Sequence, residues 1–383
     1  MRRYKGKYQL PRSRKPRGGG AFLWLMVLVL IVFAVWLWWN DHKRPAPDGK
    51  VAETQLVRTN VPAPLIVKPT PSPVEPTPSP PAQLPTQPAQ APIAADRFPR
   101  PARDTLETQI VLARHAMSPG SIDGVMGSQT RAALVAFQQK QGLQQTGALD
   151  SDTRATLRLT SPPITTYVVT PDDLARLQPL SKTWLGKSQQ SALDYESVLE
   201  LVAERGHASP TLTRRLNPNV DWTNVIAGTE LKIPDANYAA PAQKATFAII
   251  SLGEKTLEAF DARSNLLAHF PVSIAARVEK RPVGELHVAV IAPNPNYTFD
   301  PDIFPESEEG RLLGRKLVLP PGPNNPVGVA WVGLDQPGYG IHGTPVPELV
   351  GRTESHGCFR LANWNAEYFL KLVWMGMPVY VEP

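Results

Sequence analysis

The segment YGIHGTPVPELVGRTESHGCFRL, residues 339–361, contains the only cysteine of this 383-residue chain, Cys358. His342 stands twelve intervening residues before Ser355, and His356 lies two positions before the cysteine. A thiol attacks acyl groups only as the thiolate, so a nucleophilic cysteine needs a base or a positive partner nearby. Two of the seven histidines of the chain lie in this short segment. The segment therefore predicts a cysteine nucleophile with a histidine base.

The residues that flank the cysteine fit the same chemistry. Gly357 would let the backbone approach a substrate closely, and backbone N–H groups there would stabilise an oxyanion. Arg360 would clamp a carboxylate with its planar guanidinium group. A single cysteine is also often a small buried apolar residue, and a single histidine a satisfied core residue, so spacing alone leaves a purely structural role open.

The segment resembles the active-site signature of the L,D-transpeptidase catalytic domain family, which reads His-Gly-Thr followed by Ser-His-Gly-Cys-x-Arg. Pro282-Val283-Gly284 and LPPGPNNPVG, residues 319–328, extend the resemblance over residues 245–383. The family implies a mostly β catalytic domain. From Ala245 onward the sequence agrees, with β-rich runs between turn signals at residues 253–254 and 264–265. Residues 363–373 predict one capped helix before a final strand.

The resemblance also implies a role for each matching residue. The catalytic group is Cys358 as nucleophile, His342 as general base, His356 as the second histidine that shapes the site, and the signature residues Ser355 and Gly357. The residues expected to bind substrate are Arg360, Gly343, Thr344 and Tyr339. The family needs no cofactor or metal, and the remaining histidines are scattered along the chain.

The implied reaction begins with attack on the carbonyl at the L-centre of the third residue of a tetrapeptide stem, with loss of the terminal D-alanine. The resulting acyl-enzyme passes its acyl group to an amine. An amine of another stem gives a 3-3 cross-link, and a lipoprotein lysine gives protein attachment. Two alternatives stay open: an L,D-carboxypeptidase or hydrolase that uses the same cysteine, and a catalytically inactive wall-binding tether.

Two modules are expected upstream of this domain. In residues 102–160, GVMGSQTRAAL recurs as GALDSDTRATL, and each copy predicts a glycine turn followed by a helix that starts near Ser128 or Ser151. The pattern resembles the peptidoglycan-binding type 1 family, a three-helix module. The later copy has Thr146-Gly147 where the family usually has Asp-Gly. Residues 165–235 resemble an α+β LysM module, which binds N-acetylglucosamine-containing glycans, although residues 171–194 are an insertion and a packing module without ligand is an alternative.

The N-terminal third predicts a membrane anchor and a spacer. Residues 1–20 carry eight Lys or Arg and no acidic residue, so they account for the net charge of +6, and no nucleic-acid partner is expected. Residues 21–39 are an uninterrupted apolar run of transmembrane length; a cleavable signal peptide is the alternative. Residues 40–101 form a Pro-rich disordered linker. The chain is thus expected to be a multidomain, single-pass inner-membrane protein with a cytoplasmic N-terminus and its catalytic domain in the periplasm or cell envelope.

Overall fold

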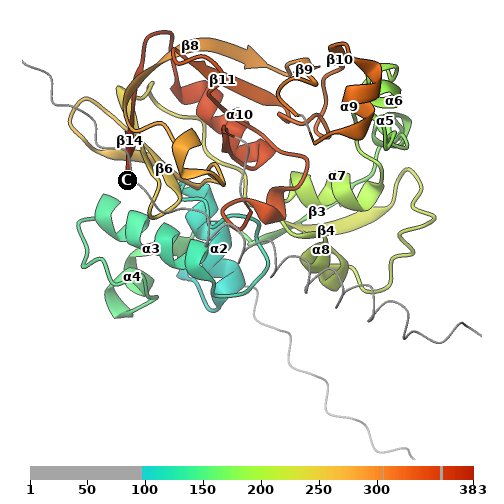
Figure 1. The fold of residues 1–383 in the computed structure, drawn as a ribbon. Helices are drawn as coiled ribbons and strands as arrows, with labels where there is room; N and C mark the ends of the chain where they lie inside the picture. The colour runs from blue at the N-terminus through green and yellow to red at the C-terminus, as the bar shows by residue number, and fades with distance from the viewer. Residues whose placement is uncertain (1–96, 305, 354–356) are drawn as a thin grey trace, which may run out of the picture. The chain divides into compact units, whose positions relative to one another are not determined.

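The computed structural model describes residues 97–304, 306–353 and 357–383. The predicted basic tail, the apolar run of residues 21–39 and nearly all of the Pro-rich linker lie outside the described residues. Within the described part of the chain, no helix is long and apolar enough to cross a membrane. The described residues form a helical module, a middle module of helices with two strands, and a β-rich domain (Figure 1).

Three helices and a short strand pair make up the helical module. Its elements are β1 (Arg100–Pro101), α2 (Thr105–Arg114), α3 (Ser128–Lys140), α4 (Ser151–Thr156) and β2 (Arg158–Leu159). The side chains of Asp104 and Asp150 cap α2 and α4 by accepting backbone N–H groups at 2.8 and 2.9 Å. The two predicted helix starts, Ser128 and Ser151, are confirmed.

A buried glutamine holds the first copy of the internal repeat. The amide of Gln109 donates to Asp123 Oδ1 at 3.0 Å, to the carbonyl of Val125 at 3.1 Å and to Thr130 Oγ1 at 3.0 Å. Its carbonyl oxygen accepts the N–H of Gly124 at 2.8 Å. One side chain therefore satisfies a glycine turn and ties it to α3.

In the second copy of the repeat, the side chain of Gln138 satisfies the glycine turn in the same way. Its amide donates to Thr146 Oγ1 at 2.9 Å and to Thr153 Oγ1 at 2.8 Å, and its carbonyl oxygen accepts the N–H of Gly147 at 2.9 Å. Thr146 thus supplies the acceptor that Asp123 supplies in the first copy. The change from Asp-Gly to Thr-Gly keeps the hydrogen bond that the turn requires.

The middle module has a strand at each end. Its elements are β3 (Ile164–Val168), α5 (Pro171–Arg176), α6 (Trp184–Ser188), α7 (Val198–Arg205), α8 (Pro210–Leu216) and β4 (Glu230–Pro234). The two strands pair antiparallel, from Ile164 opposite Pro234 to Val168 opposite Glu230. The predicted insertion, residues 171–194, contains α5 and α6.

The β-rich domain is built on one eight-stranded sheet with the order β13-β12-β11-β8-β14-β5-β6-β7. Its strands are β5 (Phe247–Ser251), β6 (Thr256–Phe260), β7 (Leu266–Pro271), β8 (Gly284–Pro293), β11 (Ala330–Leu334), β12 (Gly340–His342), β13 (Phe359–Arg360) and β14 (Pro378–Glu382). A separate antiparallel pair is formed by β9 (Tyr297–Phe299) and β10 (Leu317–Leu319). The helices of the domain are α9 (Glu308–Leu313) and α10 (Asn363–Leu372), and two 3-10 turns are η1 (Val278–Lys280) and η2 (Pro347–Leu349). The predicted turns at residues 253–254 and 264–265 join β5 to β6 and β6 to β7.

The two faces of strand β5 enter different cores. Ala248 and Ile250 pack in the main core, which α10 covers with Phe369. Phe247 and Ile249 pack instead against the apolar side chains of α2 and α3. Because side chains alternate along a strand, the helical module covers the face opposite to α10. The module is therefore part of the same packed body as the β-rich domain.

We expect Gln138→Ala to lower the free energy of unfolding by about 2–3 kcal/mol, because buried donors and acceptors of the second repeat would lose their partner. Chemical unfolding followed by circular dichroism measures this loss. The neighbouring Gln139 is exposed, and Gln139→Ala is the matched control with an expected change within about 0.5 kcal/mol. Equal losses in the two variants would contradict the role given to Gln138.

Candidate active site

The short parallel pairing of β12 with β13 sets the geometry of the predicted site. Ile341 is in register with Phe359, and His342 with Arg360. The side chains of Ile341 and Phe359 belong to the main core. Since successive side chains of a strand alternate between its faces, His342, Arg360 and Cys358 belong to the other face. The pairing therefore gathers three of the predicted residues on one side of the sheet.

The thiol of Cys358 lies beside the backbone that leads into β12. It is half-buried, and its Sγ donates to the carbonyl of Gly338 at 3.5 Å. Burial raises the pKa of the Cys358 thiol above its ordinary value, while a backbone hydrogen bond with Gly340 and the charge of Arg360 act in the opposite direction. The thiol is therefore mostly protonated at neutral pH, and an attack needs a base.

His342 is held as a neutral base. Its Nδ1 lies 2.6 Å from the carbonyl oxygen of Gly343, which only accepts hydrogen bonds, so Nδ1 carries the proton and Nε2 stays an acceptor. Burial lowers the pKa of His342 to about 4. The ring stacks on Trp331 with 5.5 Å between centroids. A Cβ on Gly340 would lie 2.5 Å from the Trp331 ring, so glycine is needed there for the stack.

A cavity of about 290 Å³ is lined in part by Arg360. The backbone of Arg360 is fixed by two 3.0 Å hydrogen bonds with Ser273. Burial lowers the pKa of the guanidinium, and the charges of Cys358 and Tyr297 raise it. The other lining residues are Trp184, Lys187, Ser273, Asn324, Pro326, Thr344, Pro345, Val346, Leu349, Val350 and Thr353. Arg360 thus brings a fixed positive charge into a small cavity.

The other residues predicted to bind substrate lie in different places. Thr344 is buried and lines the cavity of Arg360. Gly343 lies next to it and accepts the proton of His342. Tyr339 packs against the main core and is not among the described residues that line this cavity. The structure brings Thr344 to Arg360 and does not bring Tyr339 there.

The signature residues around the cysteine are described in part. A Cβ placed on Gly357 would meet no atom of the described residues within 4 Å. Ser355 and His356 lie outside the described residues, and their predicted roles remain predictions. Tyr297, which the sequence did not single out, lies near enough to be affected by the thiol: burial, and then the charge of Cys358, raise the pKa of Tyr297 to about 12.

Asn363 supports the loop that follows His342. Its Oδ1 accepts the N–H of Thr344 at 3.0 Å and that of Val329 at 3.4 Å. Its Nδ2 donates to Glu204 at 3.1 Å and to the carbonyl of Pro323 at 3.1 Å. The helix predicted over residues 363–373 is present as α10, but the predicted cap is wrong, because no side chain caps its first turn. The side chain of Asn363 bonds to the loop instead.

Glu204 connects this network to the middle module. It lies in α7, and Tyr195 OH donates to its Oε1 at 3.3 Å. Burial raises the pKa of Glu204 to about 8, so the carboxyl is mostly neutral at neutral pH. Two glycines allow the close approach, since a Cβ on Gly328 or Gly343 would lie 2.0 or 2.2 Å from Asn363 Oδ1. The catalytic loop is thus supported by a residue outside the β-rich domain.

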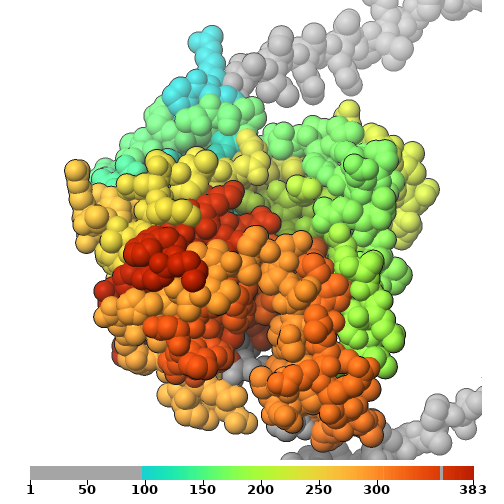
Figure 2. All heavy atoms as spheres, turned by 90° about the horizontal axis from the view of Figure 1, so that it is seen from above, coloured from blue at the N-terminus to red at the C-terminus, as the bar shows by residue number. Residues whose placement is uncertain are grey.

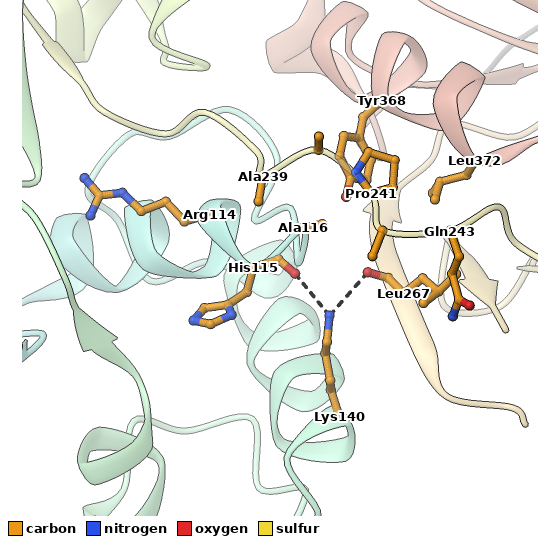
Figure 3. Close-up of a pocket in the computed structure, with 12 residues that line it drawn as sticks. Arg114, His115, Ala116, Lys140, Ala239, Pro241, Gln243, Leu267, Tyr368 and Leu372 are labelled. Atoms are coloured by element: carbon orange, nitrogen blue, oxygen red, sulfur yellow. Dashed lines mark hydrogen bonds between the residues drawn. The ribbon is translucent and has the colours of Figure 1, made fainter.

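Two further cavities lie where the modules meet. One, of about 270 Å³, lies between the helical module, β7 and α10. Lys140 lines it, and its Nζ donates to the carbonyl of His115 at 3.5 Å and to that of Leu267 at 3.4 Å (Figure 3). The other, about 950 Å³, lies between α7, α10 and residues 321–323. Neither cavity is lined by Cys358. Among the described residues, no cluster of three or more His, Cys, Asp or Glu side chains is placed to hold a metal ion.

Comparison with known families assigns the domain that holds this site. Residues 245–381 match the model of the L,D-transpeptidase catalytic domain. These residues are an L,D-transpeptidase catalytic domain. Residues 102–157 match the model described as "Putative peptidoglycan binding domain". Together the two matches support peptidoglycan as the partner. The LysM-like interpretation of residues 165–235 stays a prediction.

Individual relatives carry the same name. "Putative L,D-transpeptidase YkuD" of Bacillus licheniformis is 24% identical over 185 residues, which are 48% of this chain and 93% of that protein. "Putative L,D-transpeptidase YqjB" of Bacillus subtilis is 32% identical over 105 residues, which are 26% of this chain and 51% of that protein. The solved L,D-transpeptidase 3 from Mycobacterium tuberculosis is 16% identical, covering 42% of this chain and 77% of that one with a TM-score of 0.29.

We expect alkylation of Cys358 by iodoacetamide to be slow at pH 7 and to accelerate as the pH rises past the ordinary thiol pKa of about 8.5. The reason is that burial raises the thiol pKa, so less thiolate is present at neutral pH than in a free peptide. The rate is measured by mass spectrometry between pH 5 and pH 10. The same chain in denaturant is the control, since its single cysteine then has an ordinary pKa. A rate that levels off below pH 7 would show a thiolate–imidazolium pair and contradict the neutral pair described above.

We expect Asn363→Ala to lower the free energy of unfolding by about 2 kcal/mol, because the buried N–H of Thr344 loses its acceptor and the carboxyl of Glu204 loses one of its two donors. Denaturant titration measures the change. Lys371→Ala, on the exposed side of the same helix, serves as control and should change stability by no more than about 0.5 kcal/mol.

Proposed function

We propose that this protein is a peptidoglycan L,D-transpeptidase in which Cys358 is the nucleophile and His342 the general base. The observation that carries the proposal is the hydrogen bond from His342 Nδ1 to the carbonyl of Gly343. It fixes the tautomer whose Nε2 accepts a proton, on the same face of the sheet as Cys358. The low pKa of His342 keeps that nitrogen free of a proton at neutral pH.

Acylation would begin when His342 Nε2 removes the proton of the Cys358 thiol. The sulfur attacks the carbonyl at the L-centre of the third stem residue and forms a tetrahedral intermediate. Collapse of the intermediate breaks the bond to the terminal D-alanine, whose amine takes the proton back from the imidazolium. The products are a thioester on Cys358 and free D-alanine. Arg360, in the adjoining cavity, is proposed to hold a carboxylate of the stem.

Transfer would reverse these roles. A primary amine attacks the thioester, His342 takes a proton from it, and the thiol of Cys358 is released. With the side-chain amine of another stem the product is a 3-3 cross-link, and with a lipoprotein lysine it is an attached protein.

The remaining parts are proposed to hold the enzyme at its polymer. The helical module would bind peptidoglycan and raise the local concentration of substrate. The antiparallel pairing of β3 with β4 around the helices supports a LysM-like, glycan-binding middle module. Residues 21–39 would anchor the chain in the inner membrane, and residues 40–101 would carry the catalytic domain toward the wall.

The test is product analysis after incubation with purified disaccharide-tetrapeptides. We expect the wild type to release D-alanine and to form 3-3 linked dimers. Cys358→Ala should give neither product, and His342→Ala should acylate at least about 10²-fold more slowly because it lacks the base. His287→Ala is the matched control, since His287 is half-exposed on β8 and pairs with Asp335; its activity should equal that of the wild type.

The alternatives give different products. Tripeptides without dimers would identify a carboxypeptidase, and dimers unchanged by Cys358→Ala would refute the nucleophile. A lysine-containing lipoprotein peptide added as competing amine tests the second acceptor. Binding to sacculi without any product would identify a tether.

A further inference from the structure

The cavity that contains Arg360 also contains a second cation from another module. Lys187 lies in α6, inside the insertion of the middle module, and lines this cavity together with Trp184. Both cations therefore face one space of about 290 Å³. None of the described residues that line it is acidic. A cavity with this lining favours a ligand that carries negative charge.

Helix α6 is fixed to the β-rich domain by a carboxylate. Glu309 of α9 accepts the backbone N–H of Trp184 and that of Leu185, each at 2.8 Å. The hydroxyl of Thr183 caps the same turn by accepting the N–H of Gly186 at 3.0 Å. The position of α6 is thus set by the catalytic domain as well as by its own module.

An aromatic stack completes this attachment. The ring of Trp184 lies parallel to that of Phe299 in β9, with centroids 4.3 Å apart and planes 13° apart. Phe304 and Tyr297 lie next to the stack. In the space-filling view, the light-green atoms of this part of the middle module lie against the orange ones of the catalytic domain (Figure 2). The insertion is therefore a wall of the catalytic domain rather than a separate loop.

The ammonium group of Lys187 contacts an aromatic ring, and no described carboxylate pairs with it. Its Nζ lies 5.6 Å from the centroid of the Trp184 ring, a cation–π contact that holds the side chain near the cavity. Among the described residues, no carboxylate lies within ion-pair distance of Lys187. A positioned ammonium without an acidic partner loses little entropy when it binds an anion.

We propose that Lys187 forms an anion subsite that binds a second carboxylate of the donor stem peptide, on its second or third residue, while Arg360 holds the terminal one. The proposal rests on the proposed function for the identity of the ligand. A stem peptide is an extended chain with several carboxylates, so two of them can contact two separate cations in one cavity. A stem whose inner carboxylates are amidated lacks one of these contacts and is expected to bind more weakly. The insertion would then be a specificity element that the catalytic domain alone lacks.

The experiment measures equilibrium binding of tetrapeptide stems to the full chain carrying Cys358→Ala, so that no turnover intervenes. We expect Lys187→Met to raise the Kd about tenfold for the free-acid stem, because one charge-assisted hydrogen bond is lost. Lys187→Arg should restore binding to within about twofold, since it keeps the charge. Lys182→Met, an exposed residue of the same insertion, is the control and should bind as the parent does.

Amidated stems separate recognition from structural damage. Amidation of the recognised carboxylate should weaken binding to the parent by the same factor, and Lys187→Met should then cause no further loss. An unchanged Kd for Lys187→Met with the free-acid stem would overturn the proposal. An equal loss for acid and amidated stems would also overturn it, because it would show that Lys187 only supports Trp184. These outcomes do not depend on the product analysis, which tests the proposed function by itself.

Discussion

The parallel pairing of β12 with β13 is the constraint on which the site depends. Two residue pairs in register are enough to place His342 beside Arg360 and to bring Cys358 to the same face. Ile341 and Phe359 anchor the pair in the main core from the other face. The strands are short, so their positions rely on that burial and on the hydrogen bonds between Arg360 and Ser273. A shift of one residue would turn the nucleophile into the core.

The supporting interactions come from outside the catalytic domain. Glu204 of the middle module reaches the loop after His342 through Asn363, and α6 of the insertion closes one wall of the Arg360 cavity. The helical module covers the sheet face opposite to α10, and its apolar side chains form one core with those of that sheet face. Modules that pack in this way are part of the enzyme's framework, so their removal is expected to lower its stability.

Local chemistry explains which features could be predicted from sequence. The helix starts near Ser128 and Ser151 and the turns between β5, β6 and β7 each depend on a few neighbouring residues, where turn and capping preferences act. His342 and Cys358 were identified by the resemblance of their segment to a family signature. The helix predicted over residues 363–373 was expected to be capped, yet it has no side-chain cap, and Asn363 bonds to Glu204, 159 residues away. Lys187 and Trp184 belonged to a segment that the sequence marked only as an insertion. Such contacts depend on how separate modules pack, and no local preference encodes them. Tyr339, next to the signature, is partly buried and packs against the main core, and its predicted role in substrate binding stays a prediction.

The central claim is that Cys358 forms a thioester with the stem peptide, and its most direct test is mass spectrometry of the protein quenched in acid during turnover of a disaccharide-tetrapeptide. Trypsin cleaves after Arg352 and Arg360, so residues 353–360 form one peptide that contains the cysteine. The account predicts that this peptide gains the mass of the disaccharide-tripeptide acyl group, and that hydroxylamine removes it. A turning-over enzyme whose 353–360 peptide stays unmodified, or whose adduct maps to another residue, would contradict the account.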